Sequence, residues 1–345
     1  MSPLPEAVAA MENFRRRLMS LDSRAASALI QAYGPIWSRL EARIDALLTE
    51  IEGKQVTLDQ ALRMQRLREL QRQVTAEMNR YIPTANSAIT QAQRDAVALA
   101  QRGTRRVVQA ALPDGIDMAM LSRAGINWNV LPADAFAAFV GIAGDGTPLR
   151  NLLEPLGPMA RDGVLQGLGE GIALGQGPRE TARLIRSRFG MPLTRSLTIS
   201  RTETIRSFRE ASRTQLEANR AIVPKYIRRS AQDGDVCMAC LALDGEESES
   251  GELFATHPNC RCSMIPKPIS YRDLGLPVDE PERPITGAQD WFQAQSPVIQ
   301  RQMMGPGRFA AWKAGEFDLG NMAQVRVDPT WGPTVSVKPL KEMVK

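Results

Sequence analysis

All four cysteines and the only histidine of this 345-residue chain lie between residues 237 and 262. Cys237 and Cys240 are spaced as C-x2-C, an arrangement that lets two thiolates on a tight turn bind one tetrahedral ion. The stretch HPNCRC follows, with His257, Cys260 and Cys262. In an extended backbone the side chains of Cys260 and Cys262 would face the same side. These are five candidate ligands for an ion that takes four, so one of them is left out. The pattern predicts a structural zinc site.

Other interpretations of the cluster stay open. The cysteines would also pack between two strands as reduced thiols without metal. Redox chemistry is less favoured, because the C-x2-C pair does not open a helix after a thioredoxin-like strand. A catalytic zinc needs an open coordination position and usually a nearby general base. With a single histidine in the chain, no second imidazole can serve as base or as ligand. The residues therefore favour a structural over a catalytic zinc, and no catalytic residue is predicted.

The composition is that of a folded protein with more than one domain. Hydrophobic residues make up 43% and charged residues 23%, and the length favours two or three domains. Aromatic residues are scarce at 5%, which favours helical packing over a β-sandwich or barrel. No apolar run approaches the roughly 18 to 20 residues of a membrane span, and the N-terminus lacks the pattern of a secretory signal. A reducing, cytosolic setting and no contact with a membrane are expected, and there clustered cysteines indicate metal before disulfides.

The net charge of +5 conceals a basic block. Residues 178–230 carry 13 basic and 4 acidic side chains, whereas residues 111–177 and 231–345 are both acidic on balance. Residues 193–221 contain neither Gly nor Pro and are predicted to form one long helix. This block is either a solvated face or a contact surface for nucleic acid or an acidic partner. The predicted contact residues on one side of the helix are Arg206, Arg209, Arg213 and Arg220.

Residues 1–112 are predicted to form a helical arm or bundle. Apolar residues recur here at spacings of three and four, as along a packed helix: Trp37, Leu40, Ile44, Leu47 and Ile51. A capping box of Thr57 and Gln60 opens a further helix, which is expected to end at Pro83 before another helical stretch begins at Ala85.

Residues 113–284 are predicted to form a mixed core and residues 285–345 a C-terminal helix followed by short strands. In the core, the stretch KYIRRSA has strand character, and CRCSMIPKP is its expected antiparallel partner. The acidic segment between them contains Asp244-Gly245, typical of a hairpin tip. The fold class is therefore α-rich α+β: long N-terminal helices, a helical core with a small Cys/His-clustered β-hairpin, and a short α/β tail.

Several motifs occur in an order that resembles a known family. They are the helix GQGPRETARLIRSRFG, the helix start SRTETIRSF, the stretch CMACLALDG, then HPNCRC, and a tail with DWFQAQSPVIQRQMM and RFAAWKAG. In this order they are similar to the Mu F-like minor head proteins, or head morphogenesis proteins, of tailed bacteriophages. The resemblance extends over approximately residues 110–330.

The resemblance implies a low-copy minor capsid protein of the virion, without enzymatic activity. Such proteins associate with the portal vertex and are incorporated during procapsid assembly in the bacterial host cytoplasm. The implied partners are the portal protein, the major capsid or scaffolding protein, and packaged double-stranded DNA bound without sequence specificity, with a role in packaging or ejection. Two alternatives are weighed against it: a zinc-stabilised nuclease that uses the basic block, and a zinc-ribbon DNA-binding regulator.

Overall fold

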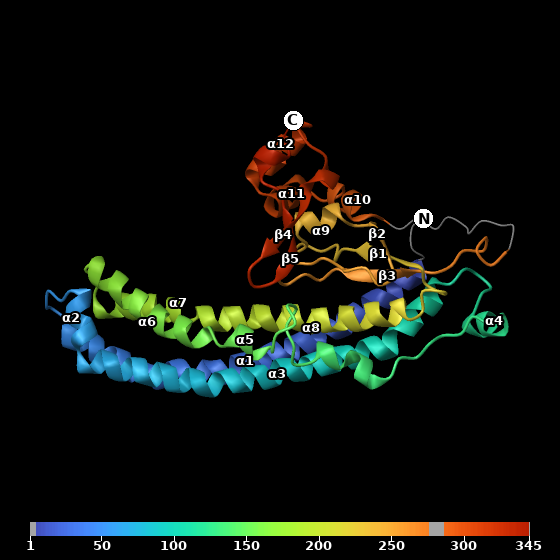
Figure 1. The fold of residues 1–345 in the computed structure, drawn as a ribbon. Coiled ribbons are helices and arrows are strands. Elements are labelled where there is room, and N and C mark those ends of the chain that lie inside the picture. Colours follow the sequence, from blue (N-terminus) through green and yellow to red (C-terminus); the bar gives the residue numbers. More distant parts are fainter. Residues whose placement is uncertain (1–4, 276–285, 345) are drawn as a thin grey trace. The chain divides into compact units, whose positions relative to one another are not determined.

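The computed structural model describes residues 5–275 and 286–344, and helices dominate it (Figure 1). The three longest are α1 (Pro5–Ile51), α3 (Gln65–Ala111) and α8 (Met191–Glu217). In the described residues, strands form one three-stranded and one two-stranded antiparallel sheet. The predicted α-rich α+β class, with long N-terminal helices and a small sheet beside the Cys/His cluster, is confirmed.

The chain divides into two compact units, and each of the three long helices contributes residues to both. Unit 1 comprises Met1–Ser20, Gln93–Val140 and Thr204–Lys345, and unit 2 comprises Leu21–Ala92 and Gly141–Glu203. The predicted limit between residues 284 and 285 lies outside the described residues. The division into residues 1–112, 113–284 and 285–345 stays a prediction.

In unit 2, the apolar seam of α1 is buried as its spacing predicted. Leu40, Ile44 and Leu47 have no exposed surface. The ring of Tyr33 packs edge-on against that of Tyr81, with 5.0 Å between the centroids, and its hydroxyl donates to the backbone carbonyl of Phe189 at 2.5 Å. The Tyr33 ring also packs against that of Phe189, with 5.4 Å between the centroids. These aromatic side chains come from α1, α3 and α7 (Pro178–Phe189), so they connect helices that are far apart in sequence.

The short helix α2 (Leu58–Arg63) begins at the predicted capping box, but the predicted break at Pro83 is wrong. Both capping-box hydrogen bonds between Thr57 and Gln60 are present. Helix α3 runs unbroken through Pro83, which is itself exposed. Tyr81 and Ala85 on either side of it are buried. Burial of such apolar surface on both sides offsets the roughly 3 kcal/mol that an interior proline costs a helix.

Glycines at intervals of four hold α6 (Leu156–Ala173) close to α7 (Pro178–Phe189). A Cβ atom on Gly167 would lie 2.6 Å from the Cα atom of Ile185, and one on Gly163 would lie 2.9 Å from the carbonyl oxygen of Arg188. A Cβ atom on Gly171 would collide with Thr181. The two backbones therefore approach to a distance that only glycine permits on this face of α6.

The three-stranded sheet of unit 1 has the order β2-β1-β3. Strand β1 (Lys225–Arg229) pairs antiparallel with β3 (Ser263–Lys267), and this confirms the predicted pairing of KYIRRSA with CRCSMIPKP. Its other edge pairs with β2 (Glu247–Glu249). Asp244-Gly245 is thus not the free tip of a hairpin: the Gly245 N–H donates to the carbonyl of Arg228 at 2.9 Å, and the chain returns into the sheet.

The C-terminal region of unit 1 has the predicted helix and short strands. The helix is divided, because Ser296 caps a new start and Pro297 occupies its first turn. None of the described helices is both long and apolar enough to span a membrane. The elements of this region are α10 (Ala288–Gln293), α11 (Pro297–Met304), α12 (Pro306–Lys313), β4 (Ala323–Asp328) and β5 (Gly332–Val337). The remaining α-helices are α4 (Met118–Arg123), α5 (Arg150–Leu153) and α9 (Met238–Ala242).

Candidate metal centre

The C-x2-C pair lies at the start of the short helix α9. Cys237 is the N-cap residue, and its Sγ accepts a hydrogen bond from the backbone N–H of Cys240 at 3.3 Å. The backbone of Cys237 is extended and that of Cys240 is helical, so the chain bends between them and turns both sulfurs toward the same point. The predicted tight turn is present.

The other candidate ligands lie on the segment that leads into β3. Asn259 has a left-handed backbone, with φ of 63°, and the Cys260 N–H donates to the carbonyl of His257 at 3.0 Å. This turn brings the histidine and the two cysteines to the same side of the segment. The imidazole Nδ1 lies 2.7 Å from the carbonyl oxygen of Pro258, which leaves Nε2 facing the sulfurs.

All five candidate ligands come together in unit 1. Nε2 of His257 lies 3.1 Å from the Sγ atoms of both Cys237 and Cys240. The Sγ of Cys240 lies 3.8 Å from that of Cys260. The ligand atoms form two triads, each with all members within 4.8 Å of one another. The triads are Cys237–Cys240–His257 and Cys240–Cys260–Cys262, so Cys240 belongs to both.

These residues fit a zinc ion. None of the four cysteines forms a disulfide, so every sulfur is available as a ligand. Two sulfurs bound tetrahedrally to zinc at about 2.3 Å lie about 3.8 Å apart, the separation found between Cys240 and Cys260. The side chains of Cys240, Cys260 and Cys262 are almost completely buried within a larger apolar core. Burial suits a closed structural site and leaves little access for a substrate.

The cluster holds charge even without an ion. The hydrogen bond from Cys240 lowers the pKa of Cys237 to about 5, and His257 contributes in the same direction. Hydrogen bonds from its neighbours Cys240 and Cys262 also lower the pKa of Cys260. Burial opposes protonation of His257, but hydrogen bonds to Cys237 and Cys260 outweigh it and raise the pKa to about 10. Lowered pKa values favour the thiolate form that binds a metal ion, and the ion would displace the proton from Nε2 of His257 on binding.

Arg209 supports the cluster from inside the protein. Its side chain is 4% exposed, its Nε donates to the carbonyl of Cys262 at 3.0 Å, and its Nη2 donates to that of Cys260 at 2.5 Å. The guanidinium also lies 5.5 Å from the ring centroid of Phe254. Its positive charge lowers the pKa of Cys260 after the larger effects of the neighbouring thiols and burial. Arg209, which the sequence analysis predicted to contact a partner, thus lies against the segment that carries His257, Cys260 and Cys262.

A second buried arginine holds the same segment. Arg228 on β1 is 5% exposed, its guanidinium lies 4.0 Å from the ring centroid of Phe254, and its Nη2 donates to the carbonyl of Ala255 at 2.8 Å. No sequence pattern indicated this role, because an arginine in a short strand can also lie on a solvated face. Together Arg209 and Arg228 bind three carbonyl groups of residues 255–262.

Asp244 joins the end of the α9 turn to the sheet. One carboxylate oxygen accepts from the Ser230 N–H at 2.6 Å, and the other accepts from the Ala288 N–H at 2.8 Å. Arg229 lies 3.3 Å from the second oxygen. The Asp in C-x2-C-x3-D-G therefore serves as a buried connection between three segments of unit 1.

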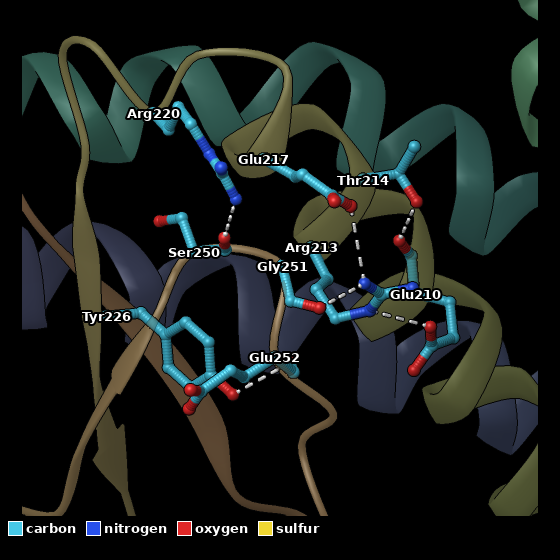
Figure 2. A network of polar contacts seen from close by, with 9 residues as sticks. All are labelled: Glu210, Arg213, Thr214, Glu217, Arg220, Tyr226, Ser250, Gly251 and Glu252. Carbon is cyan, nitrogen blue, oxygen red and sulfur yellow. Dashed lines mark hydrogen bonds and ion pairs between the residues drawn. The ribbon is translucent and has the colours of Figure 1, made fainter.

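The other predicted contact arginines have different surroundings, and one of them, Arg220, lies just beyond the end of α8 (Figure 2). Arg213 lies between Glu210 and Glu217 and donates to the carbonyl of Gly251 at 2.7 Å. Arg220 is exposed and donates to the carbonyl of Ser250 at 3.1 Å. Both tie the end of α8 to the segment after β2. Arg206 is half-buried and also has an interaction within the protein.

Comparison with known proteins finds a family model that matches the region of the cluster. The family model described as Phage Mu protein F like protein matches residues 162–265, the span that contains α7, α8, β1, α9 and all five candidate ligands. No curated protein and no solved structure matches the chain. The match is narrower than residues 110–330, over which the sequence resemblance extends, but the family is the same. Residues 162–265 are therefore similar to the Mu protein F-like family, which is consistent with a protein of phage head morphogenesis.

Proposed function

We propose that this protein is a low-copy minor head protein of a tailed bacteriophage that binds at the portal vertex or the inner capsid. The observation that carries the proposal is the coincidence of the family match with the buried cluster: all five soft ligands lie inside residues 162–265. The protein would act during head assembly, and the portal protein and the major capsid or scaffolding protein would be its partners.

The metal would have a structural role in this function. Zinc bound by Cys237, Cys240, His257 and Cys260 would connect α9 to the segment before β3, and Cys262 would remain outside the first coordination sphere. This choice follows from the contacts of Cys240, whose sulfur lies beside both His257 and Cys260. When bound, the ion would supply a rigid cross-link between these two segments.

Burial of the cluster favours this structural role over catalysis. A hydrolytic zinc must present an open position to substrate, and the sulfur-bearing residues Cys240, Cys260 and Cys262 are at most 3% exposed. We therefore infer that the chain has no enzymatic activity. A nuclease would be detected by incubating the protein with plasmid and a divalent metal, and nicking that Cys240→Ser abolishes would contradict the inference.

The experiment that tests the function is a count of this chain in purified phage particles by quantitative mass spectrometry, relative to portal and major capsid protein. The expected result is a small, reproducible copy number, near that of a single vertex rather than of the capsid lattice. A Cys240→Ser chain should be incorporated less, whereas the exposed control Ser27→Ala should be incorporated normally. Absence of the wild-type chain from finished particles would contradict a structural role in the head.

A further inference from the structure

The C-terminal region, residues 286–344, packs on the short helix α9, which follows Cys237 and contains Cys240. The main contacts of α9 are with α10, β4, β5 and the 3-10 helix η2 (Leu319–Met322), which lie around it in Figure 1. The buried apolar side chains of the region belong to the same core as those of α9, so the two share one interior. These side chains are Phe292, Phe317, Leu319 and Met322 from the region, and Met238, Cys240 and Leu241 from α9.

The same region also holds the second segment that carries candidate ligands. The backbone N–H of Val335 in β5 donates to the carbonyl of Thr256 at 2.8 Å. Thr334 forms a parallel bridge with Thr256, which directly precedes His257. Strand β5 therefore lies beside α9 and also beside the segment that leads from His257 to β3.

Polar contacts fix the start of the region to residues on either side of the C-x2-C pair. The carbonyl of Thr286 accepts from Nη1 of Arg229 at 2.9 Å and from Nε2 of Gln232 at 2.9 Å. The Ala288 N–H donates to the carboxylate of Asp244 at 2.8 Å. Since Arg229 and Gln232 precede the pair and Asp244 follows it, the region contacts the chain before, within and after the α9 turn.

Helix α9 depends on its surroundings for its conformation. It spans only Met238–Ala242, and a helix this short is not stable in water by itself. Its residues Met238 to Leu241 are at most 3% exposed, so packing supplies its stability. The positions of the Cys237 and Cys240 sulfurs follow the position of α9. Docking of the C-terminal region therefore places two of the candidate ligands.

Docking and metal binding require the same arrangement of two segments. The C-terminal region engages α9 and Thr256 together. Zinc held by the four ligands proposed above would fix α9 relative to the segment after Thr256. Two binding events that require one arrangement stabilise each other, and the factor is the same in both directions.

We propose that metal occupancy of the Cys/His cluster controls the docking of residues 286–344 on α9 and Thr256. With metal the region is docked. Without metal it detaches and exposes the apolar side chains of α9. This inference rests on the structural zinc of the proposed function and adds a conformational switch to it. It concerns residues outside the span 162–265 that the family model matches.

The test is hydrogen–deuterium exchange of the full-length protein, followed by mass spectrometry, with zinc bound and after treatment with a strong chelator. Amides of residues 286–344 should exchange roughly tenfold faster without metal, whereas those of α6 in unit 2 should not change. Unchanged exchange of residues 286–344 in a protein that native mass spectrometry shows to have lost its zinc would overturn the coupling alone. A protein that never carries zinc would overturn the metal site and the coupling with it.

Reciprocity gives a second measurement that uses the metal-loaded protein. Met322→Ala truncates a fully buried side chain of η2 and should weaken zinc binding about tenfold, measured by competition with a chromophoric chelator at fixed pH. The matched control is Met304→Ala, which truncates an equally buried methionine of α11, a helix whose main contacts are with α12. It should leave zinc affinity unchanged. Equal losses of affinity in the two variants, or no loss in Met322→Ala, would overturn the proposal.

Discussion

The Nε atom of Arg209 lies 3.0 Å from the carbonyl oxygen of Cys262, so a buried arginine of α8 holds the segment that carries three of the candidate ligands. The same guanidinium bonds to the carbonyl of Cys260. Ligand positions in this segment therefore depend on a side chain that is not a ligand. Such outer-shell partners fix ligand orientation in metal sites.

Replacement of Arg209 by methionine should strongly destabilise the protein. The substitution keeps most of the side-chain volume but leaves the carbonyls of Cys260 and Cys262 without their donor. A loss of about 2–4 kcal/mol in the free energy of unfolding is expected, measured by urea denaturation. Arg220→Met is the matched control, because Arg220 also donates to a carbonyl but is exposed. Equal losses in the free energy of unfolding for the two substitutions would show that the position of Arg209 beside the cluster does not add to its contribution to stability.

Two cysteine substitutions should differ in metal content. Cys240 belongs to both triads, so Cys240→Ser should abolish binding of the one zinc expected per chain. Cys262→Ser should retain that zinc, because the four ligands proposed do not include it. Inductively coupled plasma mass spectrometry of reduced, purified protein gives the stoichiometry directly. Zinc lost from Cys262→Ser but retained in Cys260→Ser would exchange the roles assigned to these two residues.

Gly167→Ala should destabilise unit 2, whereas Gly34→Ala should not. The new Cβ atom on Gly167 would lie 2.6 Å from a backbone atom of α7, so the two helices must separate. Overpacking of this kind costs about 1–3 kcal/mol. Gly34 lies inside α1 with no atom within 4 Å of the new Cβ, and alanine there should stabilise the helix by about 0.5–1 kcal/mol. Thermal denaturation distinguishes the two, and changes of the same sign would contradict the close approach of α6 and α7.

The Arg39–Glu77 pair should make stability depend on pH. The bidentate hydrogen bond from Arg39 lowers the pKa of the Glu77 carboxyl below its ordinary value. The pair therefore stabilises the folded protein above the unfolded pKa of about 4.3, and this contribution disappears as the pH falls through the lower folded value.

The variant Arg39→Met should accordingly unfold at a lower temperature than wild type at neutral pH. The difference between the two should shrink as the pH falls below about 4. Arg63→Met removes an exposed pair with Asp59 and should change stability little at any pH. A difference between Arg39→Met and wild type that stays constant with pH would exclude titration of Glu77 as its cause.

The sequence predicted the structure best where short spacings between residues determine the local fold. The C-x2-C and HPNCRC spacings indicated one cluster, and the strand character of KYIRRSA and CRCSMIPKP indicated the pairing of β1 with β3. Turn residues were equally informative at the capping box of Thr57 and Gln60. These features depend on residues that are close together in the chain or share a clear period.

Features that depend on packing between distant parts of the chain could not be predicted from the sequence. Helical periodicity placed Arg209 in a row with Arg206 and Arg213, but only the folded chain shows that its side chain turns toward Cys260 and Cys262. The helix through Pro83 continues because flanking residues are buried, which local propensity does not include. Likewise, the glycines of α6 matter only because α7 packs against them.

Native mass spectrometry of the protein, purified under reducing conditions without added metal, is the most direct test of the metal site. The expected species is heavier than the bare chain by one zinc ion, and a strong chelator should remove the ion and lower the unfolding temperature. A chain that carries no metal, and whose unfolding temperature is unchanged by chelator or by added zinc, would contradict the claim that the Cys/His cluster is a structural metal site.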